Sequence, residues 1–191
     1  KGIVYSRKAV ALLNAIDIPA KKADLLFKLS KRYLWHYQDT KMASSLDSSE
    51  LFSLQQLAIA KSINRNSSIA AAFNNLQGIA YEKPDFRKAL RFLDSSFAYS
   101  DISNPATLAT NYYDKADILI EMKNYQEAER MADSALAIYQ RLQSVAYIGE
   151  TYELLSRIAL SKGDFKKAFE KRELSRAITD SIKNLEKVSL V

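Results

Sequence analysis

The chain of 191 residues offers few groups that could carry out catalysis. His36 is the only histidine, so one chain cannot build a serine–histidine–carboxylate triad or a multi-histidine metal site. There is no cysteine, which excludes disulfides, thiolate metal ligands and cysteine nucleophiles. The four glycines are too far apart to form a phosphate-binding loop: Gly2, Gly78, Gly149 and Gly163. We therefore predict no catalytic residues, no metal site and no cofactor.

Paired carboxylates are the remaining candidates for acid–base chemistry. Glu127 with Glu129, and Glu150 with Glu153, lie among charged residues in segments with helical periodicity. A catalytic pair also has to reach a bound substrate in a cleft, which nothing in the sequence indicates. We interpret both pairs as solvated helix faces. His36, in the run RYLWHYQ, is expected to pack or to face water near a turn.

The composition favours an all-α protein. Hydrophobic residues make up 48% of the chain, enough for one core or for a stack of small units that share one. Four Gly and three Pro are too few for an all-β fold. No apolar run reaches the roughly 18 residues of a membrane span. The start at Lys1-Gly2, without an initiator Met, predicts a processed or truncated product.

The formal net charge of +6 is moderate for this length. Lys and Arg are interspersed with Asp and Glu, which is typical of solvated helix surfaces. Nucleic-acid binding through this charge is a competing interpretation, and it predicts an affinity that falls steeply with salt. We predict no nucleic-acid partner.

One helix–turn–helix motif recurs along the chain, most clearly in YYDKADILIEMKNYQEAERMADSA, residues 112–135. An aromatic column holds Phe86, Tyr125 and Phe165, which are 39 and then 40 residues apart (125 − 86 and 165 − 125). A column of small residues follows three positions later, at Ala89, Ala128 and Ala168. Because backbones approach closely only at small side chains, we expect the alanines where paired helices cross and the aromatics in the wedge at each turn.

The repeat defines one predicted domain over residues 1–191. It comprises an incomplete first unit (1–19) and four repeats: 20–66, 67–104, 105–143 and 144–187, the last with a long C-terminal helix. Neither helix of a pair can bury its apolar stripe alone, so the pairs should stack on one another.

Two segments depart from the repeat. A helix is predicted over Ser6 to Ile16, with Pro19 as a stop signal after it. The segment Asp39 to Ser49 is rich in Ser and Asp, which favour turns, and we predict an insertion there of about two helical turns.

These features resemble tetratricopeptide repeats. The family pattern is matched best in the fourth repeat, at Tyr152, Leu155, Ser156, Ala159, Gly163-Asp164, Phe165, Ala168 and Ser175. The resemblance covers residues 21 to 187. The period of 39 to 40 exceeds the usual length of about 34, and Gln140 and Asp180 stand where the family has Pro. The resemblance implies a right-handed α-solenoid of antiparallel helix pairs that binds a protein or peptide.

The longer period and the ending Thr179 to Lys187 resemble the extracytoplasmic sensor region of bacterial tetratricopeptide sensor histidine kinases and related membrane-tethered regulators. This implies a periplasmic or extracytoplasmic location, with membrane attachment only through a segment outside this chain. The apolar residues Ile178, Ile182, Leu185 and Val188 have near-heptad spacing, which is typical of helices that pair. This spacing is compatible with a homodimer through the C-terminal helix. The alternatives are a scaffold without a signalling role and a cytoplasmic location.

The resemblance also implies that the opening helices line a concave contact face. Its candidate contact residues are Phe27, Lys31, Asn74, Tyr81, Tyr113, Asp117, Glu153 and Arg157, with Leu34, Gly78, Ile120 and Leu160 on the same stripes. The Lys and Asn residues that clamp a terminal carboxylate in some family members are not reproduced, and no basic stripe runs along this face. For Tyr81 and Tyr113, simple packing between repeats stays an equal alternative.

Overall fold

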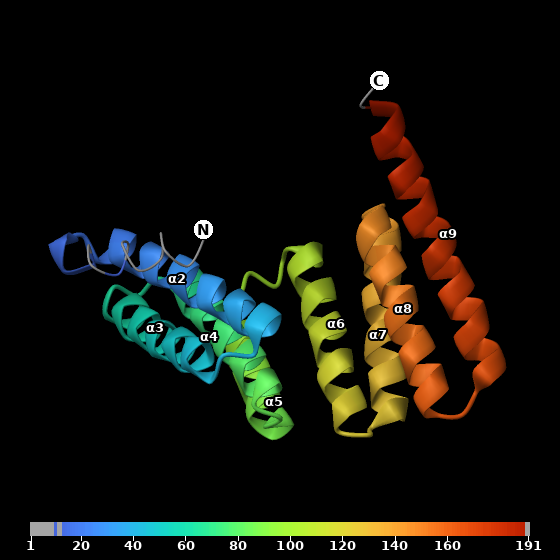
Figure 1. Ribbon diagram of the computed structural model, residues 1–191, viewed down its shortest axis with the longest axis horizontal. Coiled ribbons are helices and arrows are strands. Elements are labelled where there is room, and N and C mark those ends of the chain that lie inside the picture. Colours follow the sequence, from blue (N-terminus) through green and yellow to red (C-terminus); the bar gives the residue numbers. More distant parts are fainter. Residues whose placement is uncertain (1–9, 11–12, 190–191) are drawn as a thin grey trace. The chain divides into compact units, whose positions relative to one another are not determined.

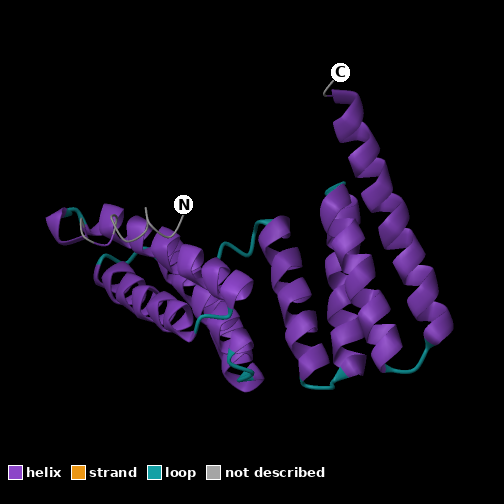
Figure 2. Cartoon of the chain, viewed as in Figure 1, coloured by secondary structure: helices purple, strands orange, loops and turns teal. Residues whose placement is uncertain are grey.

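The computed structural model describes residue 10 and residues 13–189, and this part of the chain is helical without strands (Figure 2). A short 3-10 turn, η1 (Leu13–Ala15), precedes eight α-helices (Figure 1). They are α2 (Pro19–Thr40), α3 (Ala43–Ser62), α4 (Asn66–Glu82), α5 (Phe86–Ala98), α6 (Pro105–Glu121), α7 (Tyr125–Arg141), α8 (Val145–Ser161) and α9 (Phe165–Ser189). The predicted all-α class, built from paired helices, is confirmed.

The chain divides into two compact units, Lys1–Asp101 and Ile102–Val191. In unit 1, each helix from α2 to α5 packs on the next, and α2 also touches α4. Unit 2 repeats this scheme, with α6 to α9 in succession and α6 against α8. Since short turns join the helices, neighbours run antiparallel, as the helix–turn–helix motif predicts.

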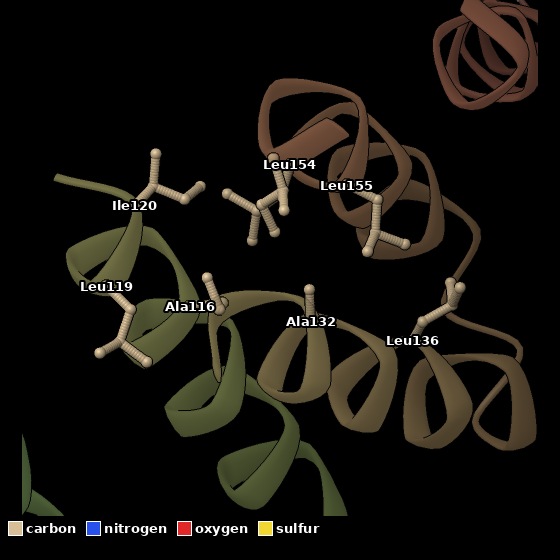
Figure 3. Close-up of a cluster of buried hydrophobic side chains, with 9 residues drawn as sticks. Ala116, Leu119, Ile120, Ala132, Leu136, Leu154 and Leu155 are labelled. Carbon is tan, nitrogen blue, oxygen red and sulfur yellow. The ribbon is translucent and has the colours of Figure 1, made fainter. Parts of the chain in front are cut away.

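The small-residue column lies where the helices cross. Ala89, Ala128 and Ala168 are all buried. Ala128 belongs to the main apolar cluster of unit 2, in which Ala132 and Leu136 of α7 meet Leu155 of α8 (Figure 3). The column therefore has the packing role that its spacing predicts.

Enlarging Ala128 should destabilise unit 2. Because its side chain is fully buried between helices, Ala128→Leu is expected to cost about 1–3 kcal/mol of unfolding free energy by overpacking. Urea unfolding followed by circular dichroism measures this cost. Ala137→Leu, at an exposed position of the same helix, is the matched control and should change stability by less than about 0.5 kcal/mol.

The aromatic column is only partly buried. Tyr125 packs on the unit 2 cluster. The Phe86 ring meets Tyr81 edge-on, with ring centroids 5.6 Å apart. Phe165, however, is 71% exposed. The prediction that it fills a wedge is wrong, because no helix follows α9 within the described residues to close that wedge.

The helix boundaries correct two predictions near the N-terminus. Most of the helix predicted over residues 6–16 lies outside the described residues, and Leu13–Ala15 forms a 3-10 turn. Pro19 is the first residue of α2 and does not end a preceding helix. Proline suits this position because the first amide of a helix has no partner within it. Pro105 opens α6 in the same way, and the Asn104 side chain accepts a hydrogen bond from the Ala106 amide (2.9 Å).

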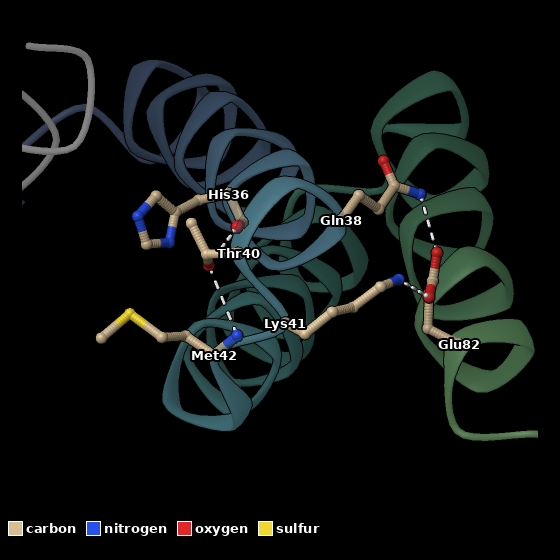
Figure 4. Close-up of polar contacts among 6 residues, drawn as sticks. All are labelled: His36, Gln38, Thr40, Lys41, Met42 and Glu82. Atoms are coloured by element: carbon tan, nitrogen blue, oxygen red, sulfur yellow. Dashed lines mark hydrogen bonds and ion pairs between the residues drawn. The ribbon is translucent and has the colours of Figure 1, made fainter.

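The segment Asp39 to Ser49 adds length to this repeat, as predicted, but it is mostly helical and does not form the turns that its Ser and Asp content favoured. Helix α2 continues through Thr40 and α3 begins at Ala43, which leaves Lys41 and Met42 as the turn. The Thr40 hydroxyl donates to the His36 carbonyl (2.6 Å) and accepts from the Met42 amide (3.4 Å) (Figure 4). The additional residues lengthen the two helices to 22 and 20 residues.

Buried serines join α2 to α3. The Ser30 hydroxyl of α2 donates to the Ser49 carbonyl (3.0 Å), and the Ser49 hydroxyl donates to the Ser30 carbonyl (2.8 Å). Ser53 lies 2.5 Å from the Ser30 hydroxyl. These small side chains let α2 and α3 approach closely while their hydroxyls remain hydrogen-bonded.

One ion-pair arrangement recurs in both units. In unit 1, Lys83 donates to Glu50 (2.5 Å) and Lys88 lies 3.8 Å from the same carboxylate. In unit 2, Lys162 (2.5 Å) and Lys167 both donate to Glu129. The lysines follow the glutamate by the same separations of 33 and 38 residues in both cases. The hydrogen bonds from these lysines hold the pKa of both glutamates below its usual value. The two units thus share their side-chain geometry as well as their backbone arrangement.

Candidate partner-binding surface

An ion pair joins α6 and α8, the opening helices of the two repeats in unit 2. We call the surface around this ion pair the α6–α8 face. Arg157 Nη1 donates to Asp117 Oδ1 (2.8 Å), and Arg157 Nη2 lies 3.4 Å from Glu121 Oε1. Asp117 and Arg157 are both predicted contact residues. The structure therefore brings together two residues that are 40 positions apart in the sequence.

Tyr113 lies partly buried beside this ion pair. Its ring packs on two apolar clusters of unit 2, and Ile148 of α8 packs on the same two. Burial, reinforced by the carboxylate of Asp117, raises the pKa of Tyr113 to about 12. The ring thus has a packing role between α6 and α8.

Asp114 is a member of this surface that sequence reasoning missed. Burial raises the pKa of its carboxyl to about 7, and repulsion from Asp117 adds to the shift. The charges of Asp114 and Glu150 both act on Tyr113 and Tyr139, which places the two carboxylates around the same rings. The signal in the sequence is the run YYDKAD, in which two carboxylates three positions apart fall on one helix face.

Two further tyrosines complete the aromatic part of this surface. Tyr139 of α7 and Tyr147 of α8 stack with ring centroids 4.9 Å apart and planes 12° from parallel. The Tyr139 hydroxyl lies 3.1 Å from that of Thr110 on α6. Tyr139 is buried and Tyr147 is exposed, so only Tyr147 presents its ring to solvent. Neither was predicted, because both lie off the repeated columns.

Glu153 also lies beside α9. It is exposed on α8 and lines a hollow of about 500 Å³ together with residues of α9, among them Arg172 and Arg176. It stands one helical turn before Arg157 on the same helix.

In unit 1, the predicted contact residues lie on α2 and α4. Lys31 places its ammonium over two rings of its own helix, 5.8 Å from the centre of Phe27 and 5.4 Å from that of Trp35. Trp35, which was not predicted, is 49% exposed. Asn74 is exposed on α4, whereas Tyr81 is half-buried against Phe86.

Three residues placed on the contact stripes have other roles. Leu34 and Ile120 are buried. A side chain at Gly78 would lie 3.2 Å from Leu34, so this glycine lets α2 and α4 approach closely. Placing these residues on an exposed stripe is wrong, because each faces the neighbouring helix. Leu160 is exposed, as predicted.

Other polar groups of unit 1 have structural partners. His36 Nδ1 lies 2.8 Å from the Ser45 hydroxyl, which ties α2 to the start of α3. Glu82, at the end of α4, accepts from Gln38 (2.9 Å) and Lys41 (3.4 Å) of the α2 end (Figure 4). Over residues 10 and 13–189, no group of three or more His, Asp or Glu side chains could hold a metal ion. No helix in the same range is long and apolar enough to cross a membrane.

Comparison with known proteins agrees with this architecture. Residues 107–180 match the family model described as tetratricopeptide repeat, so this segment of unit 2 carries that repeat. No curated protein sequence matches the chain.

Two solved structures share the fold. BtubC (BKLC) from P. vanneervenii has a TM-score of 0.73 and 20% identity, with 93% of this chain and 74% of that chain covered. A Rap protein, solved in complex with Competence and Sporulation Factor, has a TM-score of 0.78 and 21% identity, with 97% of this chain covered. The present chain spans 51% of that Rap protein. The fold is thus that of tetratricopeptide-like helical repeat proteins.

Proposed function

We propose that this chain is a non-catalytic domain that binds a protein or peptide, and that the shared face of α6 and α8 contacts the partner. The observation that carries the proposal is the ion pair between Asp117 and Arg157, which joins α6 to α8. Tyr147 lies in the first turn of α8, where it stacks on Tyr139 of α7. Binding by a tetratricopeptide-like neighbour supports it, since the Rap protein was solved in complex with a factor.

The charge of this face indicates the class of partner. The charged groups acting on Tyr113 are three carboxylates, Asp114, Asp117 and Glu150, and one guanidinium, Arg157. Arg157 is already paired with Asp117. A partner segment that presents Lys or Arg beside an apolar side chain would complement the exposed carboxylate of Glu150 and the exposed ring of Tyr147, which precedes it by three residues on α8. We therefore favour a basic peptide segment.

Selection from a random peptide library displayed on phage tests this proposal. Peptides enriched on the purified chain should be rich in Lys and Arg, and Glu150→Lys should weaken their binding about three- to tenfold through like-charge repulsion. Glu170→Lys, an exposed substitution on α9, is the matched control. Enriched peptides that lack basic residues, or that bind Glu150→Lys as well as the original chain, would contradict the proposal.

In the fuller form of this proposal, the domain is the sensory region of a bacterial two-component signal-transduction protein, located in the periplasm or another extracytoplasmic compartment. The length of α9, which continues to Ser189, supports a helix that passes a change of state onward. Ile178 lies 3.1 Å from the position that a side chain at Gly149 would take, so it contacts α8 within the chain. Leu185 and Val188, which the homodimer option also uses, lie outside the described side chains.

The rival proposal is a cytoplasmic scaffold without a signalling role. The gene sequence after Val191 separates the two. A membrane span followed by a kinase or DNA-binding module favours the sensor, and a stop codon favours the scaffold.

A further inference from the structure

In unit 2, helix α8 packs against one side of the α6–α7 pair. Ile120 at the end of α6 is 7% exposed and belongs to the same cluster as Leu154 and Ile158 of α8. Ala132 and Leu136 of α7 are buried in that cluster too (Figure 3). Helix α8 thus covers one complete side of the pair, antiparallel to α7.

The next pair, α8–α9, leaves the equivalent side open. Leu160 stands 40 residues after Ile120 and is 56% exposed. Phe165, the equivalent of Tyr125, is 71% exposed, and Phe169, one helical turn further on, is 66% exposed. We call Leu160, Phe165 and Phe169 the open patch. Exposed large apolar side chains grouped at the end of one helix and the start of the next mark a binding surface more often than a solvated one.

The hollow described above continues this surface along α9. Its lining includes Arg172 and Arg176, which stand 40 residues after Ala132 and Leu136. Ala132 and Leu136 lie beneath α8 in the preceding pair. The hollow therefore occupies the position that α8 fills one repeat earlier, and we call it the slot.

The slot differs from its counterpart in size and charge. An arginine in place of Ala132 prevents a further helix from packing as closely as α8 does, so the slot does not suit another repeat of the same kind. Arg172 has no ion pair or hydrogen bond among the described residues. Arg176 has only a long contact, 3.9 Å, with Asp180. Both guanidinium groups can accept a carboxylate partner.

We infer that the open patch and the slot together bind an amphipathic helix of a partner protein, which lies antiparallel to α9 as α8 lies against α7. Its C-terminal turns place apolar side chains on the open patch, and its middle places carboxylates against Arg172 and Arg176. Glu153, Glu173 and Asp180 also line the slot, together with Lys183, so the positive charge is local to the arginines and carboxylates elsewhere on the partner would be repelled. This surface lies where α8 meets α9, whereas the α6–α8 face is centred on the ion pair between Asp117 and Arg157.

Two synthetic peptides test the inference. Both have the sequence of residues 145–161 (α8), and position Leu155, which packs with Ala132 and Leu136, is replaced by Glu in one and by Lys in the other. Fluorescence anisotropy should show the Glu peptide binding at least about tenfold more tightly than the Lys peptide. The double variant Arg172→Glu with Arg176→Glu should reverse this preference.

Substitutions in the open patch provide a second test of the inference. Phe165→Ser with Phe169→Ser should abolish binding of the Glu peptide while leaving circular dichroism unchanged, since both rings are exposed. Equal binding of the two peptides, or no binding of the Glu peptide to the folded chain, would overturn the inference. A dimer in sedimentation experiments that Phe165→Ser dissociates would overturn it as well, because a second copy would then be the occupant.

Discussion

Asp114→Asn is expected to stabilise unit 2 at pH 8 and to remove most of the dependence of its stability on pH. The carboxyl of Asp114 lies in a poorly solvated position and faces a second carboxylate, Asp117. No ion pair or hydrogen bond within the described residues stabilises its charge. The neutral amide of Asn has nearly the same shape and avoids the cost of burying a charge.

The direction of the pH effect follows from the two pKa values. In the folded chain the pKa of Asp114 is about 7, whereas in the unfolded chain it is about 3.9. Between these values the folded state holds a proton that the unfolded state has lost. The contribution of Asp114 to the free energy of unfolding is therefore most favourable below pH 4, and this contribution falls as the pH rises towards 7. The shift corresponds to a loss of about 2–4 kcal/mol.

Urea unfolding at pH 5 and pH 8, followed by circular dichroism, measures this difference. The original chain should be more stable at pH 5, while Asp114→Asn should show a much smaller difference. Asp133 leaves a residual slope of the same sign, because burial and then the charge of Glu129 raise its pKa too. Glu150→Gln, on the exposed surface of α8, is the control and should keep the original pH dependence. Unchanged pH dependence in Asp114→Asn would show that its charge is well solvated.

The helix pairs of this fold could be predicted because their signals are local. Small residues at Ala89, Ala128 and Ala168, with a turn three or four residues before each, specify where paired helices cross. The serine-rich segment 39–49 misled the prediction, since serine favours turns only when its hydroxyl bonds the local backbone. Here Ser49 bonds across to α2 instead. That partner is distant in sequence, so the local pattern does not reveal it.

The candidate surface could be predicted only in part. Asp117 and Arg157 occupy the same column of successive repeats, so their meeting follows from the stacking of α6 and α8. Asp114 was not predicted, because its raised pKa depends on burial in the folded chain, which the sequence pattern of α6 does not specify. The burial of Leu34 was not predicted for a related reason. The orientation of α2 towards α4 decides which side of α2 is exposed. Whether a residue at a given repeat position is buried depends on the neighbouring repeat. The residue type at that position does not reveal this.

Residues at the same position of successive repeats should therefore contribute very differently to the free energy of unfolding. Ile120 and Leu160 occupy one such position and allow a test. Ile120 is 7% exposed under α8, whereas Leu160 is 56% exposed at the open patch. Ile120→Ala removes buried methyl groups and leaves a cavity, which should cost about 2–5 kcal/mol of unfolding free energy. Leu160→Ala removes side-chain atoms that water already reaches, so its cost should stay below about 0.5 kcal/mol.

Chemical unfolding of the two variants measures both costs in one background. Adding the Glu-containing peptide turns the comparison into a test of the open patch, because Leu160→Ala should then lose part of the stabilisation that the peptide provides. Equal costs for Ile120→Ala and Leu160→Ala without peptide would mean that Leu160 is already covered. In that case the last helix pair would be a closed end of unit 2, and the partner would have to bind elsewhere.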